Sequence, residues 1–244
     1  INAALFVNNY FPGELGYAVM PFGHIWSLAV EEHSYIALSL IAVLIRRTGW
    51  SPKVIIGAAC AGSAILGTWY GTQFVGKDLI GVWMHTEVAG YGIFISALCL
   101  LHFEKRQMPH WYWLLCPALV LAGMTMHWWS VSAPARTFVG VACLAIAVNL
   151  LREAPALVKN ALSLAPLQKL GLWSFSIYVW QQPFYLLMHR NGLSNWLACL
   201  AAVGCGVLSF YLIENPARKF LNRVWAHEQP VTGRREALTF PPQA

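Results

Sequence analysis

The 244-residue sequence is 58% hydrophobic and only 11% charged, whereas about 25% of residues are charged in an ordinary soluble domain. Four stretches without Asp, Glu, Lys or Arg are each long enough to cross a hydrocarbon core, which takes roughly 20 apolar residues in a helix. These features exclude an ordinary soluble domain and predict an all-α polytopic membrane protein. The net charge of +6 is explained by basic cytoplasmic loops, without nucleic-acid binding. The charge-free stretches are 54–76, 107–135, 170–189 and 191–213.

The apolar stretches predict seven transmembrane helices joined by short loops. If residue 1 lies outside and the helices alternate, thirteen of the 16 lysines and arginines fall in inner regions and three in outer regions. Positive residues concentrate on the cytoplasmic side, so this distribution supports both the count and the orientation. We expect an extracytoplasmic segment at 1–23, a transmembrane domain at 24–214 and a cytoplasmic basic tail at 215–244. The expected helices lie at about 24–45, 54–75, 79–101, 111–131, 134–151, 170–190 and 195–214.

The first expected helix carries two adjacent acids, Glu31 and Glu32, in its outer half. Ionisable groups inside a bilayer cost about 2.5–3.5 kcal/mol each on insertion scales, so they are candidates for function. Helical spacing places Glu31 on one face with Tyr35 and turns Glu32 about 100° away. A simpler explanation for both acids is the helix N-terminus, whose dipole favours anions, with outer water close by. We expect Glu31 with Tyr35 to be functional and Glu32 to be the more solvated acid.

The third expected helix carries Glu87 in its outer half, two residues after His85. A single acid at this depth could pair with a histidine or an arginine on a neighbouring helix, which would be a structural role. It could equally belong to a functional site, and the sequence leaves both roles open.

The sixth expected helix carries a polar stripe at offsets of three and four residues. Pro183 removes a backbone hydrogen bond and predicts a kink beside the amides of Gln181 and Gln182. A broken helix lined by amides borders a cavity, but Ser, Gln and Tyr side chains also join helices to one another. Because three expected helices carry polar groups in their middle-to-outer parts, we expect one cavity that opens outward. The stripe consists of Ser174, Tyr178, Gln181, Gln182, Tyr185 and His189.

After Pro216, the segment ARKFLNRVW interleaves basic residues with Phe220, Leu221, Val224 and Trp225. This pattern predicts either a short interfacial helix on the inner leaflet or a solvated basic tail. The chain shows no spacing typical of metal ligands and no phosphate-binding loop.

Three segments resemble the acyltransferase-3 family of integral membrane O-acyltransferases. HIWSLAVEEHSY, which includes Trp26 and Ser27, resembles the family signature WSLxxEExFY. LGLWSFSIYVWQQPFYLL is similar to the late-helix pattern LGxxSYxxYLWxxPF, and IENPARKFLNR, with Glu214 and Pro216, resembles the closing E-x-P stretch. The three occur in family order over residues 24–223. Members have about ten spans and cytoplasmic ends, so the resemblance implies that three spans precede this chain.

The resemblance implies transfer of an acyl group, usually acetyl, from acetyl-CoA or another acyl-CoA to a hydroxyl of an envelope glycan or another acceptor, in the bacterial inner membrane. The family's catalytic histidine lies on its first span and has no counterpart here. Glu31 is therefore expected to support a histidine outside this chain, which would act as general base or acyl carrier. No bound cofactor, metal or nucleic acid is expected. Glu32, Tyr35, Tyr178, Gln181 and Gln182 are expected along the substrate path, whereas Trp26, Ser27, Glu87, Pro183, Glu214 and Pro216 receive structural or undetermined roles.

The chain departs from the family pattern in two places. His33 and Ser34 replace the usual Gln-Phe of the signature, and Ala89 stands where many members have an arginine. The second departure leaves Glu87 without an implied family role. Two other functions stay open: a transporter or flippase, because polar stripes on broken helices also build transport sites, and a non-catalytic partner that lacks the family's histidine.

Overall fold

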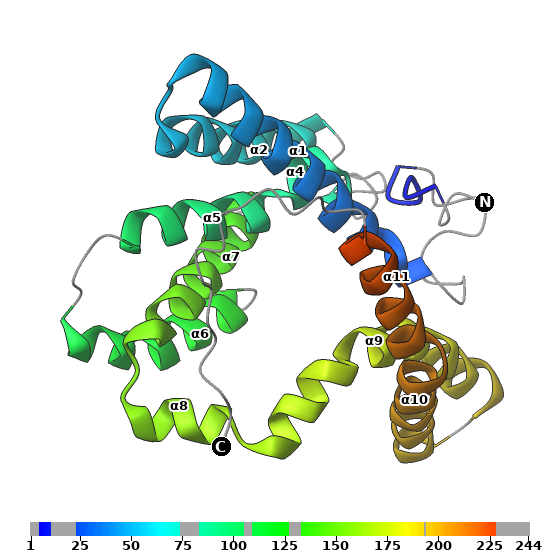
Figure 1. Cartoon of the computed structure of the whole chain (residues 1–244). Helices are drawn as coiled ribbons and strands as arrows, with labels where there is room; N and C mark the ends of the chain where they lie inside the picture. The colour runs from blue at the N-terminus through cyan, green and yellow to red at the C-terminus, as the bar shows by residue number, and fades with distance from the viewer. Residues whose placement is uncertain are drawn as a thin grey trace. The chain divides into compact units, whose positions relative to one another are not determined.

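The computed structural model describes residues 5–10, 23–73, 83–104, 109–126, 133–192 and 194–227. The regular elements in these ranges are helices, with no strand, so the all-α class is confirmed (Figure 1). The chain divides into two compact units, residues 1–170 and 171–244, and helix α9 crosses the boundary. The elements are η1 Gly23–Ile25, α1 Trp26–Thr48, α2 Pro52–Gln73, α4 Thr86–Ala89, α5 Tyr91–Phe103, η2 His110–Leu114, α6 Leu115–Thr125, α7 Ala133–Leu150, η4 Leu151–Glu153, α8 Ala156–Leu162, α9 Ala165–Asn191, α10 Asn195–Ser209, η5 Phe210–Glu214 and α11 Asn215–His227.

Within the described ranges, four helical stretches are long and apolar enough to cross a bilayer. A fifth is added if Arg136–Glu153 and Ala156–Leu162, which are bent by 114° to one another, form one span. These stretches make the chain a polytopic membrane protein. Every one of the seven expected segments contains helix, but the count of seven spans stays a prediction. The four stretches are Gly23–Thr48, Pro52–Gln73, Thr86–Phe103 and Asn195–Val224.

Gly49 and Pro52 separate α1 from α2. Gly49 adopts φ +70°, a left-handed conformation that glycine reaches without strain, and its N–H donates to the Ile45 carbonyl 2.9 Å away. Pro52 then occupies the first position of α2, where the missing N–H of proline leaves no helical hydrogen bond unmade. Arg46 and Arg47 lie in the last turn of α1, where positive charge complements the helix dipole.

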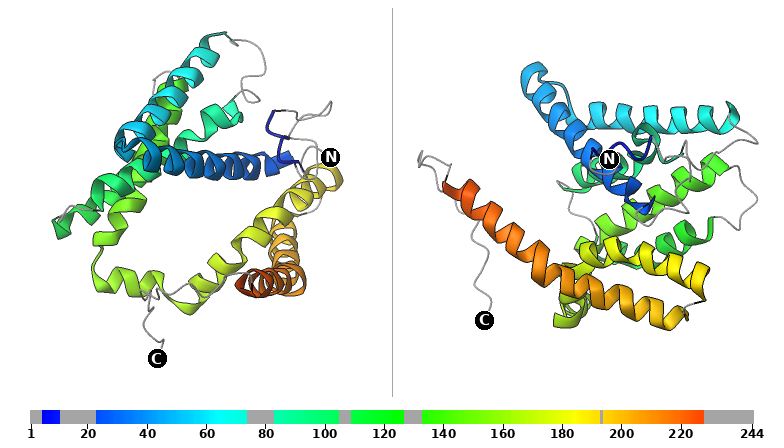
Figure 2. Two further views of the ribbon diagram at one scale, coloured as in Figure 1. Left: turned by 45° about the horizontal axis from the view of Figure 1, so that its top comes forward. Right: turned by 90° about the vertical axis from the view of Figure 1, so that its right-hand side faces the viewer.

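In the first unit, α5 packs against α2 and α7, and α7 packs against α6 (Figure 2). Gly123 of α6 and Gly140 of α7 let their two backbones approach closely. A Cβ atom built on Gly123 would lie 2.9 Å from the carbonyl oxygen of Gly140. The thiol of Cys116 also donates to the carbonyl of Ala147 across this pair, at 3.3 Å. Small residues at such contacts are how membrane helices gain close packing.

In the second unit, α10 continues through η5 into α11 as one rod (Figure 2). The turn η5 is a π-helix, which is wider than an α-helix, and it ends two residues before Pro216. Proline has no N–H, and its ring collides with the carbonyl four residues earlier, here that of Leu212. The widened turn relieves this collision and lets the helix continue.

The expected tail helix is present as α11, and its apolar and basic residues lie on different sides of the helix. Phe220, Leu221 and Val224 are 65%, 51% and 41% exposed. Helical spacing places them together on one side, while Lys219 and Arg223 point to the other. An amphipathic helix therefore forms where the sequence allowed either an interfacial helix or a solvated tail, and its contact with a membrane stays a prediction.

Candidate functional site

Several polar side chains of the first unit converge on the carboxylate of Glu87, in the first turn of α4. The hydroxyl of Tyr10 donates to its Oε2 at 2.7 Å, and the hydroxyl of Tyr70 donates to its Oε1 at 3.2 Å. The Nδ1 atom of His85 lies 3.3 Å from the same Oε1. One carboxylate thus gathers side chains from the 5–10 segment, from α2 and from the turn before α4.

A second set of contacts centres on Thr86, beside Glu87. The side-chain amide of Asn9 donates to the Oγ1 atom of Thr86 at 2.9 Å and approaches the Met84 carbonyl at 3.4 Å. The Nδ1 atom of His33 lies 2.8 Å from the same Oγ1. Asn9 is fully buried, and a buried amide must be hydrogen-bonded to avoid a large desolvation penalty. Thr86 therefore ties the 5–10 segment to α1.

The position of α4 depends on Gly90, which separates it from α5. A Cβ atom on Gly90 would lie 2.7 Å from the carbonyl oxygen of Thr86 and 3.1 Å from the Oγ atom of Ser34. Ser34 is fully buried on α1. The absence of a side chain at Gly90 lets this turn approach α1 closely, and that approach brings His33 to Thr86.

Tyr10 lies outside the expected spans and acts as a donor in this cluster. Burial is the main cause that raises the pKa of its hydroxyl above the usual value, and the bond to the Glu87 carboxylate raises it further. Tyr10 is therefore protonated at neutral pH and keeps its hydrogen bond to Glu87.

The partners of Glu87 differ from the expected histidine or arginine on a neighbouring helix. The histidine is His85, two residues earlier in the chain, and the other partners are two tyrosines. We name the set of Asn9, Tyr10, His33, Tyr70, His85, Thr86 and Glu87 the Glu87 cluster. Sequence reasoning missed most of it because hydroxyl and amide partners show no periodic pattern. The available signals were Glu87 with nearby His85, and His33, where the chain departs from the family's usual Gln.

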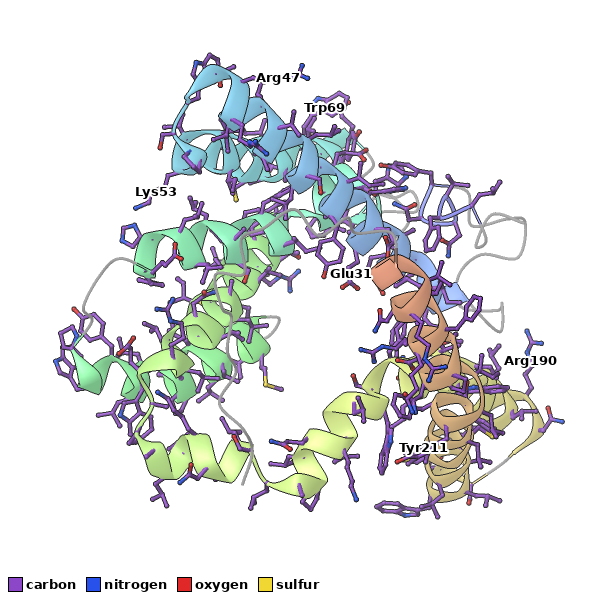
Figure 3. All side chains as sticks on the ribbon, in the orientation of Figure 1. Glu31, Arg47, Lys53, Trp69, Arg190 and Tyr211 are labelled. Carbon is purple, nitrogen blue, oxygen red and sulfur yellow. The ribbon has the colours of Figure 1, made fainter. Side chains whose placement is uncertain are left out.

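Glu31 and Tyr35 share a face of α1, as their helical spacing predicts. The hydroxyl of Tyr35 donates to the Oε1 atom of Glu31 at 2.7 Å, and Tyr35 is 50% exposed. Glu32 is exposed and Glu31 is partly exposed, and the greater solvation expected for Glu32 stays a prediction. Figure 3 marks Glu31 in the first half of α1, with Arg47 and Lys53 near the turn at its other end. Trp26 and Ser27 lie partly exposed in the first turn of α1.

In the second unit, a groove of about 440 Å³ lies between α9 and α10. Gln181 and Gln182 line it, together with Tyr185 and Cys199, whereas Tyr178 is not among its lining residues. Helix α9 stays helical through Pro183, and the kink expected there stays a prediction. The amides therefore border a groove beside a continuous helix.

Glu214, in the closing E-x-P stretch, links three elements of the second unit. The hydroxyl of Ser176 on α9 donates to its Oε2 atom at 2.6 Å, and Arg218 on α11 lies 3.5 Å from its Oε1 atom. Ser176 is 4% exposed. Glu214 thus joins α9 to η5 and α11, which is a structural role. Sequence reasoning passed over Ser176 because it lies beside the polar stripe of α9.

The predicted site residues fall in both units. Glu31, Glu32, Tyr35 and Glu87 belong to the first, and Tyr178, Gln181 and Gln182 belong to the second. The single outward-opening cavity expected to join them stays a prediction.

The helices and their polar groups define a polytopic membrane protein with ionisable side chains held at the ends of its helices. A family model described as an acyltransferase domain, Acyl_transf_3, matches residues 4–214. The match covers most of the chain, which therefore belongs to the acyltransferase-3 family and carries an acyltransferase domain of that family. No curated protein and no solved structure matches the chain significantly.

Proposed function

We propose that this chain is part of a bacterial inner-membrane O-acyltransferase. It moves an acyl group, most simply acetyl, from acyl-CoA to a hydroxyl of an envelope glycan or a smaller acceptor. The observation that carries this proposal is the family match over residues 4–214, which includes the signature on α1, the late-helix pattern on α9 and Glu214. The transporter and the non-catalytic partner lack an observation of comparable weight.

The membrane architecture supports this reaction. Acyl-CoA is made in the cytoplasm and envelope glycans lie outside it, so an enzyme that joins them must span the bilayer. The basic residues near the α1–α2 turn, including Arg47 and Lys53 (Figure 3), are expected on the cytoplasmic side by the positive-inside rule. The start of α1 is then on the acceptor side, and the C-terminus is cytoplasmic.

Within this function, Glu31 supports a histidine supplied from outside the chain. A carboxylate at hydrogen-bonding distance favours the imidazolium form and orients the ring. The bond from Tyr35 to Glu31 fixes the position of that carboxylate on an accessible face of α1. In the second unit, Gln181 and Gln182 line a groove that provides amide donors and acceptors for a polar substrate, with Tyr178 nearby on α9. Glu32, the more exposed of the two acids on α1, is proposed to contact the substrate as well.

Glu31→Gln tests the role of the carboxylate in the protein as the cell makes it. We expect acetyl transfer from labelled acetyl-CoA to membrane-associated hydroxyl acceptors to fall about 10²–10⁴-fold, the usual contribution of proton transfer that the carboxylate supports. Tyr35→Phe, which removes only the hydroxyl donor, should give a smaller loss.

Ser39→Ala is the matched control on α1, because the Ser39 hydroxyl is exposed and donates to the carbonyl of Tyr35 in its own helix. Membrane levels of all variants are compared by immunoblot. A normal rate of acceptor acylation by Glu31→Gln would contradict the role of Glu31, and movement of a glycan across the membrane without any acylation would favour a flippase.

A further inference from the structure

We propose that a pocket beside the C-terminal end of α7 binds the nucleotide end of acyl-CoA, the part that carries adenine and phosphates. This inference rests on the proposed acyl transfer and adds the place where the donor is held. The pocket has a volume of about 290 Å³. It is lined by Trp113 of η2, by Arg152 and Glu153 of η4, by the turn at 154–156 and by Lys159 of α8.

The pocket lies where the chain turns sharply after α7. Ala154 is extended, with ψ 143°, because a residue before proline avoids the helical conformation. Pro155 has no N–H with which to continue the preceding helix. Helix α8 therefore leaves at 114° to the Arg136–Glu153 stretch (Figure 1). The short helix η2 packs against η4 at this bend, which brings Trp113 to the pocket.

Trp113 provides a fixed aromatic surface. Its partly buried side chain packs against the buried cluster of Cys116, Ala147 and Leu150, and it also lines the pocket. A ring held by the core loses little freedom when a ligand binds to it. Nucleobases stack on aromatic side chains of this kind, so Trp113 suits the adenine of coenzyme A.

Arg152 and Lys159 provide the positive charge that phosphates require. Both side chains are exposed, and neither forms an ion pair with another described residue. A guanidinium group binds phosphate oxygens as a fork, and an ammonium group binds them as a point charge. Two available cations beside an aromatic ring match a ligand whose phosphates lie close to a planar base.

Glu153 is the one acid among the lining residues of the pocket. A carboxylate accepts hydrogen bonds and donates none, so it suits a ribose hydroxyl or the amino group of adenine. The two cations outweigh its charge, and the pocket keeps a net attraction for an anion.

The expected topology places this pocket on the side where acyl-CoA is made. The start of η2 and the segment from η4 to α8 fall in two of the expected inner loops, at 102–110 and 152–169. An anionic lipid headgroup on the same side also carries a phosphate, but it has no base to stack on Trp113. The aromatic ring therefore favours the nucleotide as the occupant.

The first test measures binding of radiolabelled coenzyme A to the full protein in detergent, without turnover. Arg152→Gln, Lys159→Gln and Trp113→Leu should each weaken binding about tenfold, the usual effect of losing a charged hydrogen bond or a stacked base. Adenosine 3′,5′-bisphosphate should displace coenzyme A from the wild type, and about ten times more of it should be needed for the same direct binding to each variant.

Matched controls show whether the effect belongs to the pocket. Lys169→Gln removes an exposed cation from the same expected loop, and Trp111→Leu removes an exposed tryptophan from η2 that does not line the pocket. Both should bind coenzyme A within about twofold of the wild type. Trp113→Phe keeps an aromatic face and should recover part of the loss in Trp113→Leu. Wild-type affinity in Arg152→Gln, Lys159→Gln and Trp113→Phe would overturn the proposal even if Trp113→Leu failed to fold.

The second test distinguishes coenzyme A from a lipid. The protein is placed in vesicles of phosphatidylcholine, with or without phosphatidylglycerol. Any weakening of coenzyme A binding by phosphatidylglycerol should be the same for the wild type and Arg152→Gln, because it comes from the charge of the membrane surface. A weakening that Arg152→Gln abolishes would assign the pocket to a lipid headgroup and overturn the proposal.

Steady-state acetyl transfer separates this inference from the proposed function. In Arg152→Gln and Lys159→Gln, KM for acetyl-CoA should rise about tenfold while kcat stays within about twofold, because the nucleotide end takes no part in the chemical step. A wild-type protein that transfers acetyl groups, with KM unchanged in both variants, contradicts only the pocket. A wild-type protein that neither binds coenzyme A nor transfers acetyl groups contradicts acyl transfer itself.

Discussion

Ser174 and Ser176 lie two residues apart on α9, yet their hydroxyls have different partners. Ser174 is exposed and donates to the carbonyl of Gly171 in its own helix. Ser176 is buried and donates to the Oε2 atom of Glu214 at 2.6 Å. Removing the Ser174 hydroxyl should change the stability of the protein little, because its partner lies in the same helix. The second joins α9 to a carboxylate on a distant segment, and charged acceptors make stronger hydrogen bonds.

Ser176→Ala should therefore destabilise the protein. Loss of a hydrogen bond to a partly buried carboxylate lowers the free energy of unfolding by about 1–3 kcal/mol. Thermal unfolding of the purified protein in detergent measures the difference, with Ser174→Ala as control. Equal stability of the two variants would show that the Glu214 bond adds nothing to the fold.

The three acids of the expected outer region differ in what surrounds them. Glu87 contacts two tyrosines and a histidine, Glu31 contacts a tyrosine on its own helix, and Glu32 is exposed. A carboxylate in a membrane protein gains from each donor that replaces water. The surroundings thus distinguish Glu87, whose carboxylate contacts several other side chains, from Glu31 and Glu32, whose carboxylates are more accessible on α1.

At the scale of whole helices, α9 and α10 meet through a glycine. A Cβ atom on Gly206 would lie 2.6 Å from the Cα atom and 2.8 Å from the backbone nitrogen of Ile177. Gly204, two residues earlier on the same helix, would place a Cβ atom with nothing within 4 Å. The backbone of α9 cannot move aside as a flexible side chain can. The contact therefore requires glycine at position 206, whereas position 204 has room for a side chain.

Gly206→Ala should separate α9 from α10 and lower the free energy of unfolding by about 1–3 kcal/mol, the usual effect of overpacking. Gly204→Ala should leave stability unchanged or raise it by up to about 1 kcal/mol, because alanine favours helix more than glycine does. Unfolding in detergent again compares the two variants. A tolerated Gly206→Ala would contradict the close packing of α9 and α10.

For the whole molecule, the distribution of basic residues predicts which loops face the cytoplasm. The α1–α2 turn should lie inside and the α9–α10 turn outside, because the first is flanked by Arg46, Arg47 and Lys53 and positive residues stay on the cytoplasmic side.

Single cysteines test this topology in a background without native cysteines. Asn191→Cys should react with a membrane-impermeant maleimide in cells whose inner membrane is intact, while Ser51→Cys should react only after that membrane is permeabilised. Labelling of both from the same side would disprove the alternation of spans between these two turns.

Membrane class, helical segments and family membership could be predicted from the sequence, because each depends on residues close together in the chain. Length and apolar composition indicate a span, and the motifs on α1 and α9 are short. Helical spacing also placed Glu31 beside Tyr35, four residues away. Pro183 lies inside the continuous helix α9, and the kink expected from its missing hydrogen bond stays a prediction.

The surroundings of Glu87 were decided only by the tertiary structure. Its tyrosine partners lie 77 and 17 residues away in the chain, and no periodicity connects them. The packing of α4 against α2 brings Tyr70 to Glu87, and Tyr10 reaches the same carboxylate from the 5–10 segment. By itself the sequence determined that this chain is a helical membrane protein with costly acids in its apolar helices. The fold decided which of those acids holds a histidine, since a buried or half-buried charge takes its partners from whatever segments pack against it.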